Sequence, residues 1–183
     1  MKKNLLFLLI NLLVAFMSSC GTNKVPDEED KINDYIQDTF FGATFGERQE
    51  DVLTKLSDYP IFFKTKSMVL IKSEVVFEGI TFPMMALEFE NNQFITIEFS
   101  DAFDDNNSAL SKYNEIKDYL TSKYKLTELP IDDESTLCEV AAVGRNNCAV
   151  IVGCYLVDQP FNLEPLKIVK LDFFDGRFLV ATT

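Results

Sequence analysis

The chain has 183 residues, 47% of them hydrophobic, and a formal net charge of −12 at pH 7. This length suits one domain with a packed core and is short for two. The acidic charge argues against a nucleic-acid partner, because phosphate binding requires clustered basic side chains. Histidine is absent, which removes the commonest general base, the commonest zinc ligand and every Ser-His or Cys-His nucleophile pair. We expect no cofactor and favour a non-catalytic domain, although catalysis by carboxylates alone stays open.

The N-terminal segment has the order of charged, apolar and small residues that is typical of a secretory leader. Two lysines precede an apolar run over residues 5–17, and two serines follow it. The run is shorter than the ~20 residues that a membrane-spanning helix needs. Residues 1–19 are therefore predicted to be a signal peptide.

The sequence MSSC at residues 17–20 resembles the lipobox of bacterial lipoproteins. This resemblance implies cleavage after Ser19, a diacylglyceryl group on Cys20 and a further acyl chain on the new amino terminus. Two or more chains anchor a protein stably, whereas one chain binds reversibly. The implied partner is the membrane, through the lipid on Cys20. An ordinary cleaved signal that leaves Cys20 as a plain thiol is the alternative.

Residues 20–30 read CGTNKVPDEED and offer almost nothing to bury. They are predicted to form an acidic, solvated tether that leads to a single domain over residues 31–183. The residue after Cys20 is Gly21 and not the Asp that retains Gram-negative lipoproteins in the inner membrane. The resemblance to lipoproteins therefore implies the outer membrane. The acidic run also resembles the surface-export signals of Bacteroidetes-type lipoproteins, which leaves display at the cell surface open.

Three segments of the domain have apolar residues at helical spacing. Residues 32–40 are expected to form a short amphipathic helix or, equally, an irregular segment. A second helix is expected over 47–57 and a third over 108–124, with Asn107 or Ser108 as N-cap of the third. The side chains expected to face the core from the second and third helices are Val52, Leu53, Leu56, Leu110, Tyr113, Ile116, Leu120 and Tyr124.

The rest of the domain is predicted to be strands. The clearest signal is a hairpin over 85–99, in which alternating apolar residues flank an Asn-Asn turn. If its loop has three residues, Leu87 faces Ile97 and Phe89 faces Ile95. Further strands are expected over 68–79, 137–143, 148–157, 166–174 and 178–182.

These segments predict an α+β domain, with one antiparallel sheet and two main helices packed on one face. The final hairpin, LDFFDGRFLVATT at 171–183, repeats the apolar spacing of LEFENNQFITIEF at 87–99. A degenerate tandem of helix-then-strands units would explain the repetition. Independent convergence on a common hairpin design would explain it equally well.

The segment FGERQEDVLTKL at 45–56 resembles the helix start of BamE-like and β-lactamase-inhibitor-protein-like lipoprotein domains, through Gly46 and Val52. Those domains are small periplasmic α+β units that bind other proteins. The resemblance therefore implies a protein-binding role. The chain also looks like many Bacteroidetes-type lipoproteins of uncharacterised function.

Cys138, Cys148 and Cys154 remain once Cys20 carries lipid, in a compartment that favours disulfides. A turn about Asn146 would place Cys138 opposite Cys154, at a spacing that a disulfide can bridge. Two buried thiols are the alternative. No metal site is expected from these cysteines, because the chain lacks paired CxxC ligands and histidine.

Two clusters of acidic residues could bind a metal ion or take part in catalysis. The segment SDAFDDNNS at 100–108 gathers oxygen ligands suited to calcium but does not match an EF-hand loop, so a solvated loop with a helix cap is favoured. Glu88, Glu90 and Glu98 alternate along the first hairpin and could serve glycosidase-type acid-base chemistry if they lined a cleft. Solvation of a polar sheet face is the ordinary explanation, and no catalytic residue is predicted.

The favoured function is a lipid-anchored, non-enzymatic binding or assembly module of the cell envelope. Such a module would use its sheet or an aromatic patch to hold another envelope protein. The alternatives are a surface carbohydrate-binding protein or carboxylate-dependent hydrolase, and a calcium-stabilised structural domain.

Overall fold

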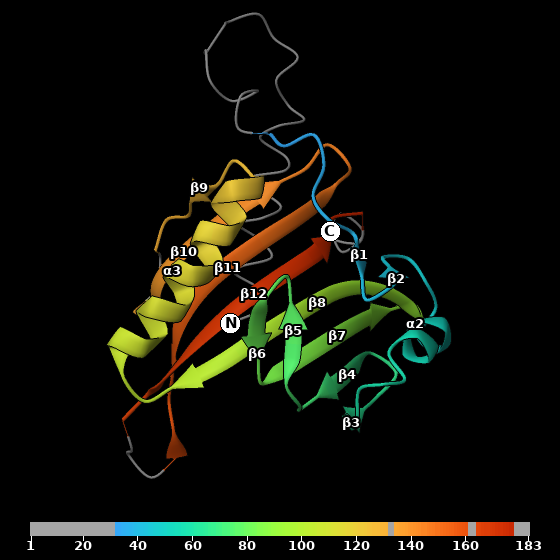
Figure 1. The fold of residues 1–183 in the computed structure, drawn as a ribbon, viewed down its shortest axis with the longest axis horizontal. Helices are drawn as coiled ribbons and strands as arrows, with labels where there is room; N and C mark the ends of the chain where they lie inside the picture. Colours follow the sequence, from blue (N-terminus) through green and yellow to red (C-terminus); the bar gives the residue numbers. More distant parts are fainter. Residues whose placement is uncertain (1–31, 132–133, 161–163, 178–183) are drawn as a thin grey trace, which may run out of the picture.

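The computed structural model describes residues 32–131, 134–160 and 164–177. Figure 1 shows a long, twisted antiparallel sheet with shorter elements packed against it. The sheet has eight strands, and each neighbouring pair is antiparallel. In spatial order they are β3 (Ile61–Lys64), β4 (Met68–Ile71), β7 (Met84–Glu90), β8 (Gln93–Phe103), β12 (Leu166–Asp175), β11 (Cys148–Val157), β10 (Thr136–Val143) and β9 (Thr127–Glu128).

The strand order is mirrored about the centre of the sheet. β3, β4, β7 and β8 follow one another from one edge to the middle, and β9, β10, β11 and β12 do the same from the other edge. The last strands of these two runs, β8 and β12, pair along their length, from Phe103 opposite Lys167 to Thr96 opposite Phe174. The domain is therefore α+β and mostly β, as predicted in outline.

Alternate side chains divide the sheet into a first face, which carries Phe99 and Leu171, and a second face, which carries Glu98 and Lys170. The helix α3 (Asn106–Lys123) contacts β8, β11 and β12, and Figure 1 shows it lying across them. The main core lies between this helix and the first face. The buried side chains of α3 are Ala109, Tyr113, Ile116 and Leu120.

Two short hairpins rich in phenylalanine also contribute to this core. In one of them, Phe77 stacks on Phe99 with ring centroids 4.7 Å apart. In the other, the ring of Phe40 lies 4.8 Å from that of Phe173. Aromatic pairs at these distances add to the free energy of apolar burial. The hairpins are β5 (Val75–Phe77) with β6 (Ile80–Phe82), and β1 (Thr39–Phe40) with β2 (Ala43–Thr44).

The helix expected over 47–57 forms as α2 (Gln49–Lys55), which contacts β2 and β8. Val52 is buried within it, and Leu56 is buried at its C-cap. Acidic residues occupy its first turn, where the helix dipole favours them. In the part of the chain that the structure describes, no helix is long and apolar enough to span a membrane.

The prediction of a helix over 32–40 is wrong, and the alternative of an irregular segment is correct. Asn33 forms a parallel bridge with Gly144, and the backbone N–H of Lys125 donates to Asn33 Oδ1 at 2.7 Å. Because these partners lie far along the chain, tertiary hydrogen bonds override the local helical spacing of the apolar residues. Ile36 is still buried, as the apolar pattern required.

The hairpin over 85–99 forms as β7 and β8, with a loop of two residues instead of three. Asn91 and Asn92 have φ angles of 51° and 66°, which suit the type I′ turn common in two-residue hairpins. The other expected strands form as β4 with β5, β10, β11 and β12, and residues 178–182 lie outside the described residues.

The register of this hairpin agrees with the prediction away from the loop. Leu87 faces Ile97 as expected. Phe89 faces Phe94 instead of Ile95, because the register shifts beyond Glu88. The shift is the ladder irregularity expected where one strand carries an extra residue.

The third helix begins earlier than the sequence pattern indicated. Its N-cap is Asp105, whose carboxylate accepts a hydrogen bond from the backbone N–H of Ser108 at 2.9 Å, so neither Asn107 nor Ser108 is the cap. Ala109 is buried, whereas Leu110 is 39% exposed. The prediction that Leu110 faces the core is therefore wrong, and Ala109 takes its place in the buried stripe of the helix.

A pair of substitutions in α3 tests this packing. We expect Leu120→Ala to lower the free energy of unfolding by about 2–5 kcal/mol, because it leaves a cavity in the core. Leu110→Ala should lower it by clearly less, about 1 kcal/mol or below, because this side chain is 39% exposed and lies outside the buried stripe of the helix. Urea unfolding followed by circular dichroism measures both, and equal losses for the two variants would contradict the packing.

Candidate functional site

The edge of the sheet at β3 presents apolar side chains to solvent. Ile61, Phe62 and Phe63 are 47%, 66% and 46% exposed. Among the described residues, β3 pairs only with β4, so one side of its backbone has no strand beside it. Proteins usually protect a sheet edge with charges or a covering element, and an apolar edge marks a site of contact with another chain.

A tight turn holds β3 against β4 and sets the direction of its backbone groups. The N–H of Thr65 donates to the carbonyl of Met68 at 2.7 Å, and the hydroxyl of Thr65 accepts from the N–H of Met68 at 2.9 Å. Backbone groups alternate in direction along an antiparallel strand. Since Thr65 points toward β4, the N–H and C=O of Lys64 point away from the sheet.

The edge is also locally basic. Lys72 lies with its Nζ 5.6 Å from the ring centroid of Phe62, within the range of a cation–π contact. Lys64 and Lys66 lie on β3 and in the following turn, and both are exposed. By comparison, Lys55 on α2 is paired with Glu47 at 2.6 Å. The lysines that form no ion pair with any described residue are Lys64, Lys66, Lys72, Lys125 and Lys167.

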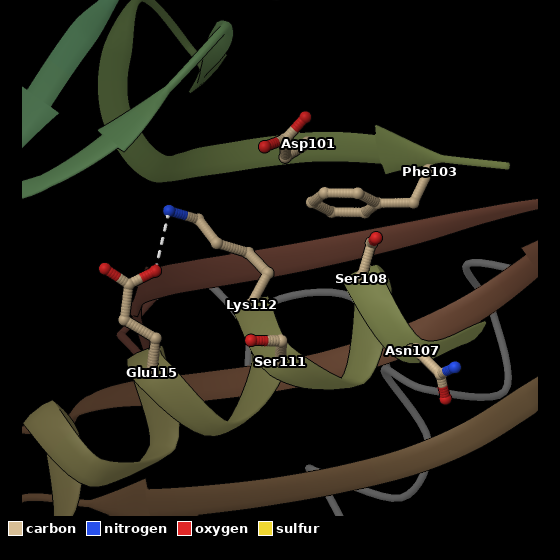
Figure 2. A pocket seen from close by; sticks show the side chains of 7 residues that line it. All are labelled: Asp101, Phe103, Asn107, Ser108, Ser111, Lys112 and Glu115. Atoms are coloured by element: carbon tan, nitrogen blue, oxygen red, sulfur yellow. Dashed lines mark hydrogen bonds and ion pairs between the residues drawn. The ribbon is translucent and has the colours of Figure 1, made fainter. Parts of the chain in front are cut away.

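A second feature is an open depression of about 590 Å³ between the end of β8 and the first turns of α3. Figure 2 shows the side chains that line it. The volume of the depression is within the range of small-molecule sites. The Nζ of Lys112 is held by Glu115 at 2.9 Å and lies 5.0 Å from the ring centroid of Phe82. Lys112 and Glu115 thus pair with each other, while Asp101 Oδ1 accepts from the backbone N–H of Ala102. The lining residues are Asp101, Phe103, Asn107, Ser108, Ser111, Lys112 and Glu115.

The acids of the segment 100–108 are not brought together as calcium ligands. Asp105 caps α3, and Asp101 Oδ1 accepts from the N–H of Ala102 at 2.8 Å. Within the described ranges, no three His, Cys, Asp or Glu side chains are placed to hold a metal ion. Asp105 thus supplies the helix cap of the loop-with-cap interpretation, and calcium binding by this segment stays a hypothesis.

Glu98 of the first hairpin joins a polar cluster on the second face, and the charge of Glu88 also acts on Lys170 in this cluster. Glu98 pairs with Lys170 at 2.7 Å, and the hydroxyl of Tyr155 donates to Glu139. The ring of Tyr155 lies where a Cβ on residue 153 would be, so glycine is required there. These pairs tie neighbouring strands together across the second face.

The pKa values in this cluster follow its charges. Burial alone would lower the pKa of Lys170, but the nearby carboxylates of Glu98 and Asp172 outweigh burial and raise it. Burial and the charge of Glu139 raise the pKa of Tyr155. Lys170 is therefore a cation and Tyr155 a neutral donor at pH 7.

The predicted opposition of two cysteines is correct in register. Cys138 and Cys154 are direct partners on β10 and β11, and the structure holds both as free thiols. A hydrogen bond from Cys154 lowers the pKa of Cys138, and the same contact with burial raises the pKa of Cys154. Cys148 is buried, which raises its pKa to about 12. The disulfide stays a prediction, and Cys20 lies outside the described residues.

The chain matches no family model, no curated protein and no solved structure. Its candidate sites are therefore defined by geometry and chemistry alone. The β3 edge was missed by the sequence analysis. Its only signal was the short run IFFK after Pro60, which does not distinguish an edge strand from a buried one.

The cap of α3 gives a pH-dependent prediction. The hydrogen bond from the Ser108 N–H lowers the pKa of Asp105 below its ordinary value of 3.8. The ionised cap should therefore stabilise the fold fully at pH values above the ordinary pKa of the unfolded chain. This stabilisation should disappear as the pH falls through the lowered pKa of the folded protein. At neutral pH, Asp105→Ala should melt at a lower temperature than the wild type, and Asp105→Asn should melt between the two. In strong acid, the melting temperatures of Asp105→Ala and the wild type should converge. Equal melting temperatures at neutral pH would show that the cap contributes nothing.

The cysteine pair gives a second prediction for this subsection. Protein isolated from envelopes without reductant should yield a peptide in which Cys138 and Cys154 are linked, because the more acidic thiol faces its partner directly. Cys148 should be alkylated only after unfolding, and Cys148→Ser should retain the linked peptide. Mass spectrometry after alkylation measures this, and two alkylated thiols at 138 and 154 would argue for the buried-thiol alternative.

Proposed function

We propose that this chain is a lipid-anchored, non-enzymatic protein-binding or assembly module of the cell envelope, which holds another envelope protein at the β3 edge. The observation that carries the proposal is the run of three exposed apolar side chains, with Phe62 66% exposed, on an edge strand. Exposed apolar surface of this kind is favourable only when a partner covers it.

The anchor is proposed from the N-terminal sequence. A leader over residues 1–19, the MSSC lipobox and the acidic tether over 20–30 support lipid attachment at Cys20 and an outer-membrane address. A tethered domain would search for its partner within a short distance of the membrane. Its effective concentration at a membrane-bound partner would then be high.

A non-enzymatic role is supported by the state of the acidic side chains. Of the three glutamates considered for acid-base chemistry, Glu98 is engaged by Lys170 and links two neighbouring strands. Glycosidase chemistry needs two carboxylates free to exchange protons across a cleft. Binding through the β3 edge requires no such pair.

We also propose that α2 and α3 cover the same face of the sheet and that the domain is a degenerate tandem. The mirrored strand order supports duplication, because each run of four strands follows a helix and ends at the centre. Val52 of α2 and Leu120 of α3 belong to one continuous core. The β5–β6 hairpin would then be an insertion in the first unit.

Photo-crosslinking in cells tests the proposed binding edge. A photoreactive amino acid at position 63 should capture a reproducible envelope protein in the full, lipidated chain. Adding Phe62→Ser should abolish most of the capture, since truncation of a central apolar anchor is costly at an interface. Val76→Ser is the matched control, because Val76 on β5 is also exposed, at 51%, and should leave the capture unchanged. Equal capture with both substitutions, or none in the parent, would refute the binding edge.

A further inference from the structure

We infer that the β3 edge receives its partner as an added β-strand, and that the partner segment alternates apolar with acidic side chains. This inference rests on the proposed function and specifies the mode of binding and the chemistry of the partner. Three independent features of the β3 edge carry it: the direction of its backbone groups, its apolar side chains, and three lysines on or near it that form no ion pair with a described residue.

The backbone of β3 is oriented for strand addition. Because the N–H of Thr65 is bonded to Met68, the donor and acceptor of Lys64 are directed away from β4. An extended segment beside β3 would satisfy these groups with main-chain hydrogen bonds, which supply affinity in recognition by strand addition. In the described part of the chain, no other strand occupies this position.

The side chains of β3 specify apolar contacts. Ile61, Phe62 and Phe63 are all about half exposed or more, and they follow one another directly. Successive side chains of a strand point to opposite faces, and the register shift between Ile61 and Phe63 changes the local twist. An added strand would find apolar neighbours on both faces of the edge and would need apolar residues of its own.

The charge of the edge specifies acidic residues in the partner. Lys64, Lys66 and Lys72 have no ion pair with a described residue, although the chain contains 29 acidic residues and 17 basic ones. A segment that carries carboxylates between its apolar residues would pair with those ammonium groups that lie on the same face as its carboxylates. Such complementarity favours encounter and register.

A second copy of this chain fits the edge less well. Two copies would bring the same lysine-bearing edges together, and each copy carries a net charge of −12. Like charges at an interface oppose association. The occupant is therefore a segment of a different protein, and self-association is an outcome that the test must be able to reveal.

The test uses the full, lipidated protein in detergent micelles and a synthetic peptide of one Trp followed by three Val-Glu repeats. The chain contains no Trp, so the peptide fluorescence reports binding directly. We expect saturable binding that weakens as salt is raised. A peptide in which every Glu is replaced by Lys should bind with an affinity at least about tenfold lower.

Two substitutions at one position separate the backbone from the charge. Lys64→Pro removes the outward N–H, and proline is tolerated on an edge strand, so we expect a folded protein that has lost most peptide binding. Lys64→Gln keeps the backbone donor and should retain part of the affinity. Thermal melts confirm that both variants fold.

Several results would overturn the inference. These are equal affinity for the Glu and Lys peptides, unchanged binding by Lys64→Pro, no saturable binding, or a dimer in light scattering that disappears with Lys64→Pro. If Lys64→Pro leaves in-cell capture at position 63 intact, strand addition is wrong while the binding edge stands. If capture fails in the parent protein as well, the proposed function fails with it.

Discussion

The pairing of β8 with β12 is the contact on which the rest of the structure depends. These strands end two runs of four strands, and their ladder extends from Phe103 opposite Lys167 to Thr96 opposite Phe174. Phe99 and Leu171, which they turn to the first face, are fully buried. α3 and the β5–β6 hairpin cover this junction, so the core is continuous across both halves. Because the runs meet at their last strands, the strands that begin them become the two edges of the sheet.

The two edges that result are chemically different. β9 has only two residues, and its Glu128 lies 3.8 Å from Lys117 of α3. A short, charged strand is a common means of protecting a sheet edge. β3 is longer, apolar and flanked by lysines without described partners. The asymmetry connects architecture to the proposed function, because within the described residues one edge of the sheet is short and charged and the other is apolar with no strand beside it.

The spacing of apolar residues predicted those helices and strands in which one face is buried and the other exposed. The third helix and the first hairpin followed from apolar spacing, and Cys138 opposite Cys154 followed from the position of a turn. Residues 32–40 were misjudged because Asn33 is held by hydrogen bonds to distant backbone groups, which no local pattern encodes. The open edge could not be predicted for the same reason. Whether β3 is central or peripheral depends on strand order, which is set by the distant pairing of β8 with β12.

Amide hydrogen exchange measured by NMR tests most directly whether β3 is an open edge of a sheet joined at its centre. Amides at the centre of β8 and β12, such as that of Leu171, should exchange only through global unfolding. The amide of Thr65, bonded to Met68, should be protected, while its neighbour Lys64 should exchange rapidly. Protection of Lys64 equal to that of Thr65 would show that the edge is already paired and would contradict the account.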